Sequence, residues 1–190
     1  MSASSTNPPE LKGQGSLLRR PQDGDVEARL AFGRDPEIHR MFGGSASFAR
    51  PYGQADAEAW LQRIIEHPVA WIIDRDGLVG EVRLDNINRP DRRASFAIGI
   101  LDPKRLGQGL GTAVTKLVLG HAFGELALHR ISLRVLAFNV RAVASYLKCG
   151  FSVEGREREA ALIDGEWHDD IMMGILAHEF PAAPDMPQGK

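Results

Sequence analysis

The sequence predicts a single α/β domain in which helices cover a mixed, mostly antiparallel sheet. Three observations support this fold class. The chain has 190 residues, which suits one domain, and 43% of them are hydrophobic, which is enough for a sizeable core. In the first third of the chain, apolar residues often recur at helical spacing, and short apolar runs separated by turn residues follow in the next part of the chain. Strands and helices then alternate, which makes the sheet mixed.

The first third of the chain predicts one strand followed by three helices. Asp23 or Asp25 can cap the first helix, which runs to Phe32. The next helix begins at Asp35-Pro36, because proline is favoured in the first helical turn. The expected elements are a strand at 17–21, these two helices, a loop at 43–53, and a helix at 56–67 with Ala59, Trp60 and Ile64 on one face.

The rest of the chain predicts a run of strands and two further helices. Asp76-Gly77 and Asp164-Gly165 are strong signals for tight turns between antiparallel strands. The expected strands cover 70–73, 78–84, 95–101 and 131–138, with two last strands around Asp164-Gly165, and the expected helices cover about 110–126 and 139–148. We expect the domain to span 15–180, between flexible polar tails at 1–14 and 181–190.

The composition argues against several function classes. A formal net charge of -2 gives no reason to expect nucleic acid or an anionic membrane as a partner. The one cysteine, Cys149, can form neither an intrachain disulfide nor a cysteine-rich zinc site. No apolar run reaches the roughly 20 residues of a membrane helix, and residues 1–15 lack the apolar stretch of a signal peptide. We therefore expect a cytoplasmic protein without a metal.

A glycine-rich loop joins the strand at 95–101 to the following helix. Gly107, Gly109 and Gly111 alternate in it, and glycine lets the backbone adopt positive φ and approach a ligand closely. The beginning of the helix offers unpaired N–H groups and a partial positive charge. With Arg105 at its rim beside Lys104, the loop suits a phosphate or pyrophosphate. An ordinary tight strand–helix turn has the same pattern.

Two familiar phosphate-binding motifs do not fit this loop. The P-loop requires Gly-Lys-Ser/Thr after its glycines, but Gly111 is followed by Thr112 and Ala113. The dinucleotide fingerprint G-x-G-x-x-G requires an acidic residue at the end of the next strand. Here the spacing is G-x-G-x-G, and the next strand ends in Asn139. An anion is therefore bound in neither of these two ways.

A second motif lies in residues 139–151. Asn139 stands where a strand ends and a helix begins, so its side chain can cap the helix or turn its amide to a ligand. Ala142 and Tyr146 are four residues apart and share a helix face. Small Ala142 permits close approach there, and Tyr146 presents a hydroxyl. Gly150 ends the helix, and Phe151 begins the next strand.

These two segments resemble the GNAT superfamily of N-acetyltransferases. Residues 106–111 are similar to the family's R/Q-x-x-G-x-G/A signature, and residues 139–151 to its N-x-x-A-x-x-x-Y-x-x-x-G-F element, in the same order. The resemblance covers about residues 16–178 and is strongest to the branch of ribosomal-protein alanine and spermidine N-acetyltransferases. Two features depart from the pattern. Leu106 replaces the signature's Arg or Gln, and the spermidine enzymes commonly have an acid early in the strand that here carries Ser95, which argues against a polyamine substrate.

The resemblance implies an acetyl-CoA-dependent N-acetyltransferase. It implies a central sheet that splays between two parallel strands and has helices on both faces. The pantetheine arm would hydrogen-bond a strand backbone, and the pyrophosphate would rest on the glycine loop. By resemblance, the cofactor-binding residues are Ile98, Gly99, Ile100, Leu101, Arg105, Leu106, Gly107, Gln108, Gly109, Leu110, Gly111, Thr112, Asn139 and Ala142.

The resemblance also implies that an amine attacks the thioester directly. Tyr146 would protonate the leaving thiolate. Glu81, on the strand beside 98–101, is the first candidate for the base that deprotonates the amine, and an exposed edge carboxylate would have the same pattern. Asp85 is the second candidate, and His129 and His168 are further ones.

The expected acceptor is a primary amine, with a protein or peptide N-terminus favoured. An α-amino group, with a pKa of about 8, is already partly neutral. Acetylation of a polyamine or aminoglycoside is the alternative, and it predicts an acidic cleft formed by Glu81, Asp85, Asp169 and Asp170. A non-catalytic CoA-binding module is a further alternative, and a homodimer is possible. The segment 42–52 is expected to lie over the acceptor site.

Overall fold

The computed structural model describes residues 8–13, 15–45 and 50–181. The strands are β1 (Leu11–Gly13), β2 (Ser16–Arg19), β3 (Ala70–Asp74), β4 (Leu78–Asn88), β5 (Arg93–Ile100), β6 (Arg130–Leu136), β7 (Ser152–Ile163) and β8 (Glu166–Leu176). The helices are α1 (Asp25–Phe32), α2 (Pro36–Met41), α3 (Gln54–Glu66), α4 (Leu110–Phe123) and α5 (Val140–Lys148), with short 3-10 turns η1 (Pro103–Arg105) and η2 (Ala177–Glu179).

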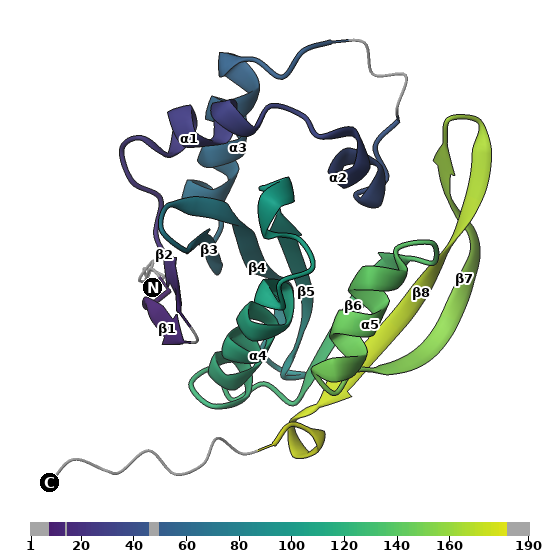
Figure 1. Ribbon diagram of the computed structural model, residues 1–190. Coiled ribbons are helices and arrows are strands. Elements are labelled where there is room, and N and C mark those ends of the chain that lie inside the picture. The colour runs from purple at the N-terminus through teal and green to yellow at the C-terminus, as the bar shows by residue number, and fades with distance from the viewer. Residues whose placement is uncertain (1–7, 14, 46–49, 182–190) are drawn as a thin grey trace, which may run out of the picture.

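The described strands form one sheet in the order β1-β2-β3-β4-β5-β6-β8-β7 (Figure 1). All neighbours pair antiparallel except β5 and β6, which are parallel. Asp76 and Gly77, which turn β3 into β4, both have positive φ, and so do Asp164 and Gly165 between β7 and β8. The predicted mixed, mostly antiparallel sheet and both tight turns are confirmed.

The sheet splits between its two parallel strands. β5 and β6 pair at three positions, the last of which is Ser95 with Ser132. Beyond this point β5 continues along β4 until Ile100 pairs with Gly80, whereas β6 continues along β8. The two strands therefore diverge, as Figure 1 shows. This is the splay that the family resemblance implied.

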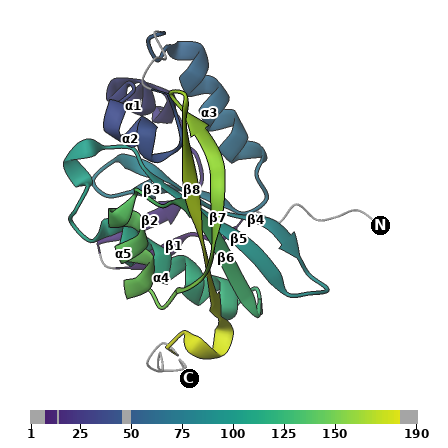
Figure 2. The same ribbon diagram turned by 90° about the vertical axis from the view of Figure 1, so that its right-hand side faces the viewer.

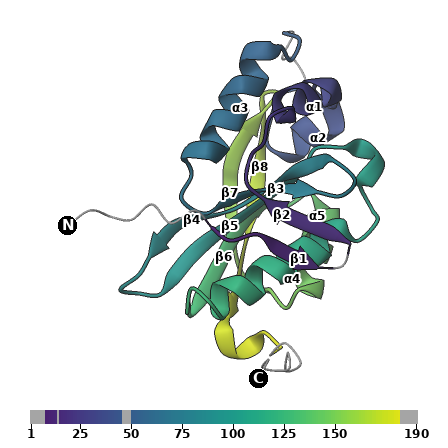
Figure 3. The ribbon, with the colours of Figure 1, turned by 90° about the vertical axis from the view of Figure 1, so that its left-hand side faces the viewer.

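Helices cover both faces of the sheet (Figures 2 and 3). On one face, Val114 and Val118 of α4 are fully buried in a cluster with Val82 of β4. On the other face, Trp60 and Ile64 of α3 pack in a second cluster against β3. Apolar layers thus pack against both faces of the sheet.

The domain begins earlier than the sequence predicts. β1 lies within residues 1–14, which were expected to be a tail, and it pairs with β2. Pro9 is also tied down, because its carbonyl oxygen accepts a hydrogen bond of 2.7 Å from Trp71 Nε1. β1 spans three residues, which is too short to show an alternating pattern, so only its tertiary partners reveal it. Residues 1–7, 14 and 182–190 of the expected tails lie outside the described residues.

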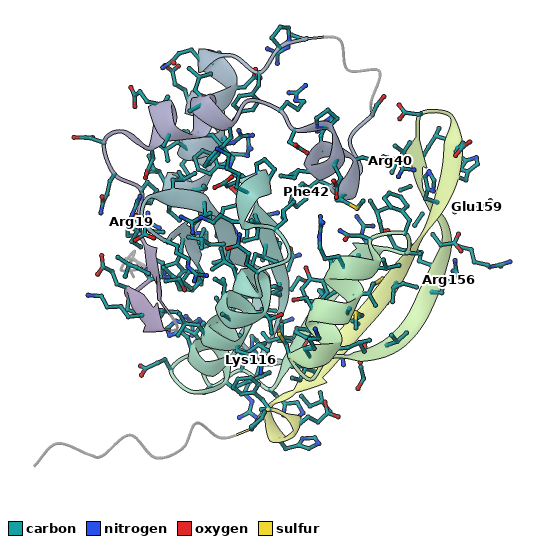
Figure 4. All side chains as sticks on the ribbon, in the orientation of Figure 1. Arg19, Arg40, Phe42, Lys116, Arg156 and Glu159 are labelled. Carbon is teal, nitrogen blue, oxygen red and sulfur yellow. The ribbon has the colours of Figure 1, made fainter. Side chains whose placement is uncertain are left out.

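Neither of the two candidate aspartates caps α1. The N-cap residue is Gly24, and Asp25 is the first residue of the helix. The Asp25 carboxylate is 3% exposed and accepts hydrogen bonds of 2.9 and 2.8 Å from Arg19. Arg19 Nε also donates to Asp74 Oδ2 at 2.7 Å. This buried ion pair, with Arg19 labelled in Figure 4, joins the entry to α1 to the edge of the sheet.

Two of the three residues expected on the buried face of α3 lie there. Trp60 and Ile64 are buried as predicted, at 4% exposure each. Ala57 is the third buried residue, whereas Ala59 is exposed. Ala57 and Trp60 are three residues apart and share a helix face, whereas the adjacent residues Ala59 and Trp60 do not.

Candidate functional site

A cavity of about 990 Å³ lies where β5 and β6 diverge. Consecutive residues of β5 line the cavity, and alternate residues of a strand point to opposite faces of the sheet. The cavity therefore has one half on each face. The half on the face of α4 and α5 is called the α4–α5 half, and the half on the face of α2 is called the α2 half. Residues from β4, β5, β6 and β8 line it together with these helices.

The glycine loop forms one wall of the α4–α5 half. Gly107 and Gly109 have φ values of 73° and 77°, a region that favours glycine. Gly109 is the N-cap of α4 and provides no side-chain cap. The first turn, Leu110, Gly111 and Thr112, lines the cavity. The N–H groups of such a turn have no partner within the helix, so this wall presents hydrogen-bond donors and a positive dipole end.

The backbone of β5 forms the edge of the opening. Leu101 donates its N–H to Val79 O at 2.8 Å, so this group points to β4. Successive N–H groups of a strand alternate in direction, and those of Ile98 and Ile100 therefore point toward β6. Residues 98–100 line the cavity, whereas Leu101 does not and packs with the cluster around α3.

Asn139 and Tyr146 of the second motif line the same half. Asn139 Oδ1 caps α5 by accepting from Ala142 N at 3.2 Å, which leaves its NH₂ group as a donor. Tyr146 is 9% exposed, and its ring contacts Phe96 and Phe151 edge-on. Burial raises the pKa of Tyr146 to about 12. The hydroxyl therefore stays protonated at neutral pH and can act as an acid.

Ser145 joins α5 to α4 at this wall. Its hydroxyl lies 2.8 Å from Thr112 Oγ1, and both residues line the cavity. Arg105 and Leu106 line it as expected, but Gln108 does not. The Gln108 side chain turns back, and its Nε2 donates to Lys104 O at 2.5 Å. Of the predicted cofactor-binding residues, Leu101 and Gln108 are thus outside the lining, and the others belong to it.

In the α2 half, three charged residues of β4 share one face of the strand. Glu81, Arg83 and Asp85 are spaced two apart, and all three line the cavity. Arg83 Nη1 lies 3.1 Å from Glu81 Oε1, and Arg83 Nε lies 3.0 Å from Asp85 Oδ1. Asp85 Oδ1 is also 2.9 Å from His67 Nε2. One guanidinium therefore bridges both candidate bases.

Across the opening, Asp170 of β8 adds a third carboxylate. It is 5% exposed and lies 3.2 Å from Arg134 Nε, and burial raises its pKa. Asp169 does not join the cluster expected for a polyamine enzyme. It points to the other face of the strand, where it binds Arg156 and accepts from Glu159 N. The alternation along β8 explains why only one of these adjacent acids reaches the cavity.

The segment after α2 covers this half, as expected for part of 42–52. Phe42 lines the cavity although it is 55% exposed, and its Cζ would lie 3.1 Å from a Cβ placed on Gly99 (Figure 4). Arg40 stacks over Phe138, with 4.5 Å from Cζ to the ring centroid. Phe42 and Gly43 are the lining residues of this segment among those described, and 46–49 lie outside the described residues.

The remaining candidates lie away from the cavity. His129 packs near His178, and the ring of His168 contacts Phe138. Cys149 is 2% exposed and belongs to the main core. Among the described residues, no group of three His, Cys, Asp or Glu is placed to hold a metal ion. The described helices include none that is long and apolar enough to cross a membrane.

Sequence reasoning missed the roles of Arg83, Arg134 and Ser145 in this site. The pattern Glu81-x-Arg83-x-Asp85 was visible and implies one shared face once the strand is assigned. The contact between Arg134 and Asp170 joins β6 to β8, and the sequence contains no signal for that pairing.

Comparisons with known proteins agree with this geometry. Residues 16–152 match the model of the acetyltransferase (GNAT) domain. The chain is 36% identical over 118 residues to spermidine N(1)-acetyltransferase of Escherichia coli K12, a match that covers 62% of this chain and 63% of that enzyme, less than two thirds of its length. It is 30% identical over 119 residues to the L-amino acid N-acetyltransferase AaaT of the same organism, covering 60% of this chain and 73% of AaaT.

A solved structure extends the likeness to nearly the whole domain. The crystal structure of spermidine N-acetyltransferase from Vibrio cholerae in complex with CoA and spermine has a TM-score of 0.72 and 28% sequence identity. The match covers 88% of this chain and 98% of that chain. With the family model matching most of its length and the splayed sheet in place, the chain belongs to the GNAT acetyltransferase family.

Proposed function

We propose that this protein transfers the acetyl group of acetyl-CoA to a primary amine. One observation carries the proposal: a single cavity passes through the splay and joins the glycine loop and α4 to the carboxylates of β4 and β8. A donor held in the α4–α5 half and an amine held in the α2 half would approach each other beside β5. Membership of the acetyltransferase family supports the same reaction.

The α4–α5 half suits acetyl-CoA, which supplies an activated thioester when bound. Gly107 and Gly109 leave open space where a side chain would stand, because a Cβ on either meets nothing within 4 Å. The first turn of α4 can donate N–H groups to the pyrophosphate. The N–H groups of Ile98 and Ile100 and the NH₂ group of Asn139 are suited to the amide carbonyls of the pantetheine arm.

Tyr146 and Glu81 are proposed as the acid and the base. The amine nitrogen bonds to the thioester carbon, the carbon–sulfur bond breaks, and Glu81 takes the proton that the amine loses. Tyr146 gives its proton to the departing sulfur and regains one from solvent. The N–H of Ile98 or Ile100 can stabilise the negative charge that develops on the carbonyl oxygen.

Two acceptor classes have support. Relatives named as spermidine N-acetyltransferases favour a polyamine over the protein N-terminus that was expected first. A second candidate is an amine that also bears a carboxylate. The relative AaaT supports it, and so does the pairing of each carboxylate lining the cavity with an arginine.

The test is release of free thiol from acetyl-CoA in the presence of single amines. The panel contains spermidine, free amino acids, short peptides and an aminoglycoside. Acceptor-dependent thiol release is the expected result, and mass spectrometry of the product identifies the acetylated nitrogen. Tight CoA binding without transfer to any amine would instead support a non-catalytic CoA-binding module.

A further inference from the structure

In the α2 half, two arginines offset three carboxylates, which leaves less negative charge than is expected for a site that receives a polycation. Glu81, Asp85 and Asp170 are its lining carboxylates, and each has an arginine nitrogen within 3.2 Å. Sites for polycationic ligands normally carry a net negative charge, which attracts the ligand and raises its association rate. Here Arg83 and Arg134 cancel most of that field.

Of these two arginines, Arg83 has the greater effect on the charge of the α2 half. Its side chain is 39% exposed and contacts two carboxylates, whereas that of Arg134 is 62% exposed and contacts one. Arg83 lies on β4, directly paired with Ala97 of β5 beside the splay. Arg83 therefore extends into the α2 half from the sheet that forms its floor.

Arg83 also retains donors for a ligand. A guanidinium has five N–H donors in a planar fork. The contacts with Glu81 and Asp85 use Nη1 and Nε, which leaves the N–H groups of Nη2 available to a ligand. A carboxylate would be bound there at close range, and an ammonium would be repelled.

We propose that Arg83 is a specificity-determining residue that selects for amines with a nearby carboxylate and against multiply charged amines. The inference rests on the proposed acetyltransfer and names its acceptor class. Glu81 remains available to the reacting amine on one side of Arg83, while the guanidinium receives the acceptor's carboxylate. Free α-amino acids and short peptides have this combination of groups, and spermidine does not.

The test compares wild type with Arg83→Gln. For each protein, kcat/KM is measured for spermidine and for a panel of amino acids and dipeptides. Loss of one positive charge from the floor of the cleft should raise the ratio of spermidine to the best zwitterionic acceptor about tenfold at low salt. This gain should shrink as salt increases, because mobile ions screen the freed carboxylates. Arg83→Lys, which keeps the charge, should retain a ratio near that of wild type.

Arg93→Gln is the matched control. Arg93 lies on the neighbouring strand β5 and pairs with Asp91 at 3.4 Å, but it does not line the cavity. This variant should leave the acceptor ratio unchanged. Melting temperature and CoA affinity, measured for every variant, distinguish an altered cleft from an unfolded one.

A binding measurement keeps the inference testable if acetyltransfer itself is not found. Calorimetric titration of spermidine into the CoA-loaded protein should give a Kd about tenfold lower for Arg83→Gln than for wild type. Equal affinities and equal acceptor ratios in folded Arg83→Gln and wild type would overturn the role of Arg83. Failure of all amines to release thiol, with the affinity shift present, would reject the proposed reaction but not the charge selection.

Discussion

Removal of the Tyr146 hydroxyl tests the proposed acid directly. Tyr146→Phe keeps the ring, and with it the packing against Phe96 and Phe151, so the fold should be retained. With a pKa of about 12, the buried phenol is a weak acid. Full transfer of its proton to a thiolate whose pKa is about 8.5 is unfavourable by about 5 kcal/mol, so the proton must move while the carbon–sulfur bond breaks.

General acid catalysis contributes about 10²–10⁴-fold, and so weak an acid places Tyr146 near the lower end. We therefore expect Tyr146→Phe to reduce kcat about 100-fold, with little change in the Kd for CoA. Thiol release under saturating acetyl-CoA measures kcat, and calorimetry measures CoA affinity. The control is the chain's other tyrosine: Tyr52→Phe should leave kcat unchanged, because Tyr52 does not line the cavity. Unchanged turnover in Tyr146→Phe would refute the acid role.

The direction of the pKa shift adds a prediction for the pH profile. Because burial raises the pKa of Tyr146 to about 12, the hydroxyl remains protonated and active throughout pH 7–10. Wild-type kcat should therefore show no decline from tyrosine ionisation below about pH 11. A decline near pH 9 that disappears in Tyr146→Phe would contradict both the burial argument and the assignment.

Three other predictions concern stability and cofactor affinity. Asp25→Asn removes the charge that Arg19 faces at 2.8 Å in a buried site, and should lower the free energy of unfolding, measured in urea, by about 3 kcal/mol. The control Asp91→Asn, which removes a charge from the exposed pair with Arg93, should change it by less than about 0.5 kcal/mol. Similar losses in both variants would show that the buried ion pair stabilises the fold no more than an exposed one. His121 is 7% exposed and burial lowers its pKa, so the unfolded chain binds a proton at this histidine before the folded chain does as pH falls below about 6.5. The stability that neutral His121 contributes is complete above that pH and declines below it, and His121→Gln should weaken the decline between about pH 7.5 and 5.5. An unaltered slope in this variant would contradict the prediction. Gly109→Ala places a Cβ on a residue with a φ of 77°, which strains the loop, and should weaken CoA binding about tenfold, as measured by calorimetry. Gly120→Ala, in the middle of α4, should leave CoA binding unchanged. Equal Kd values for the two variants would argue against the loop as the pyrophosphate site.

Most of the fold could be predicted because its signals are local. The turns at Asp76-Gly77 and Asp164-Gly165 and the proline after Asp35 depend on backbone preferences that neighbouring residues do not alter. The helix expected to begin at Asp35-Pro36 is α2, and Asp35 caps it by accepting from Ile38 N at 2.9 Å. β1 escaped prediction because its stability comes from pairing with β2 and not from its own three residues.

The candidate site was predictable in its motifs but not in its charges. Glycines and the Asn139–Tyr146 spacing depend on local geometry, and they line the cavity as expected. Gln108 and Leu101 were expected as members of continuous segments, but the Gln108 side chain turns back to Lys104 and Leu101 packs with the cluster around α3. The partner of Arg134 could not be foreseen, because Asp170 lies on a strand that reaches β6 only through the order of the sheet.

Both halves of the site result from the splay between β5 and β6. β5 and β6 part after Ser95 and Ser132 because each continues with its antiparallel neighbour, β4 or β8. The same divergence leaves the N–H groups of Ile98 and Ile100 without a strand partner and opens a passage between the two faces of the sheet. In the proposed reaction, an acceptor on the face of α2 would reach a donor on the face of α4 through this opening. Selectivity would then depend on the charged residues at the floor of the α2 half, where Arg83 is held between Glu81 and Asp85.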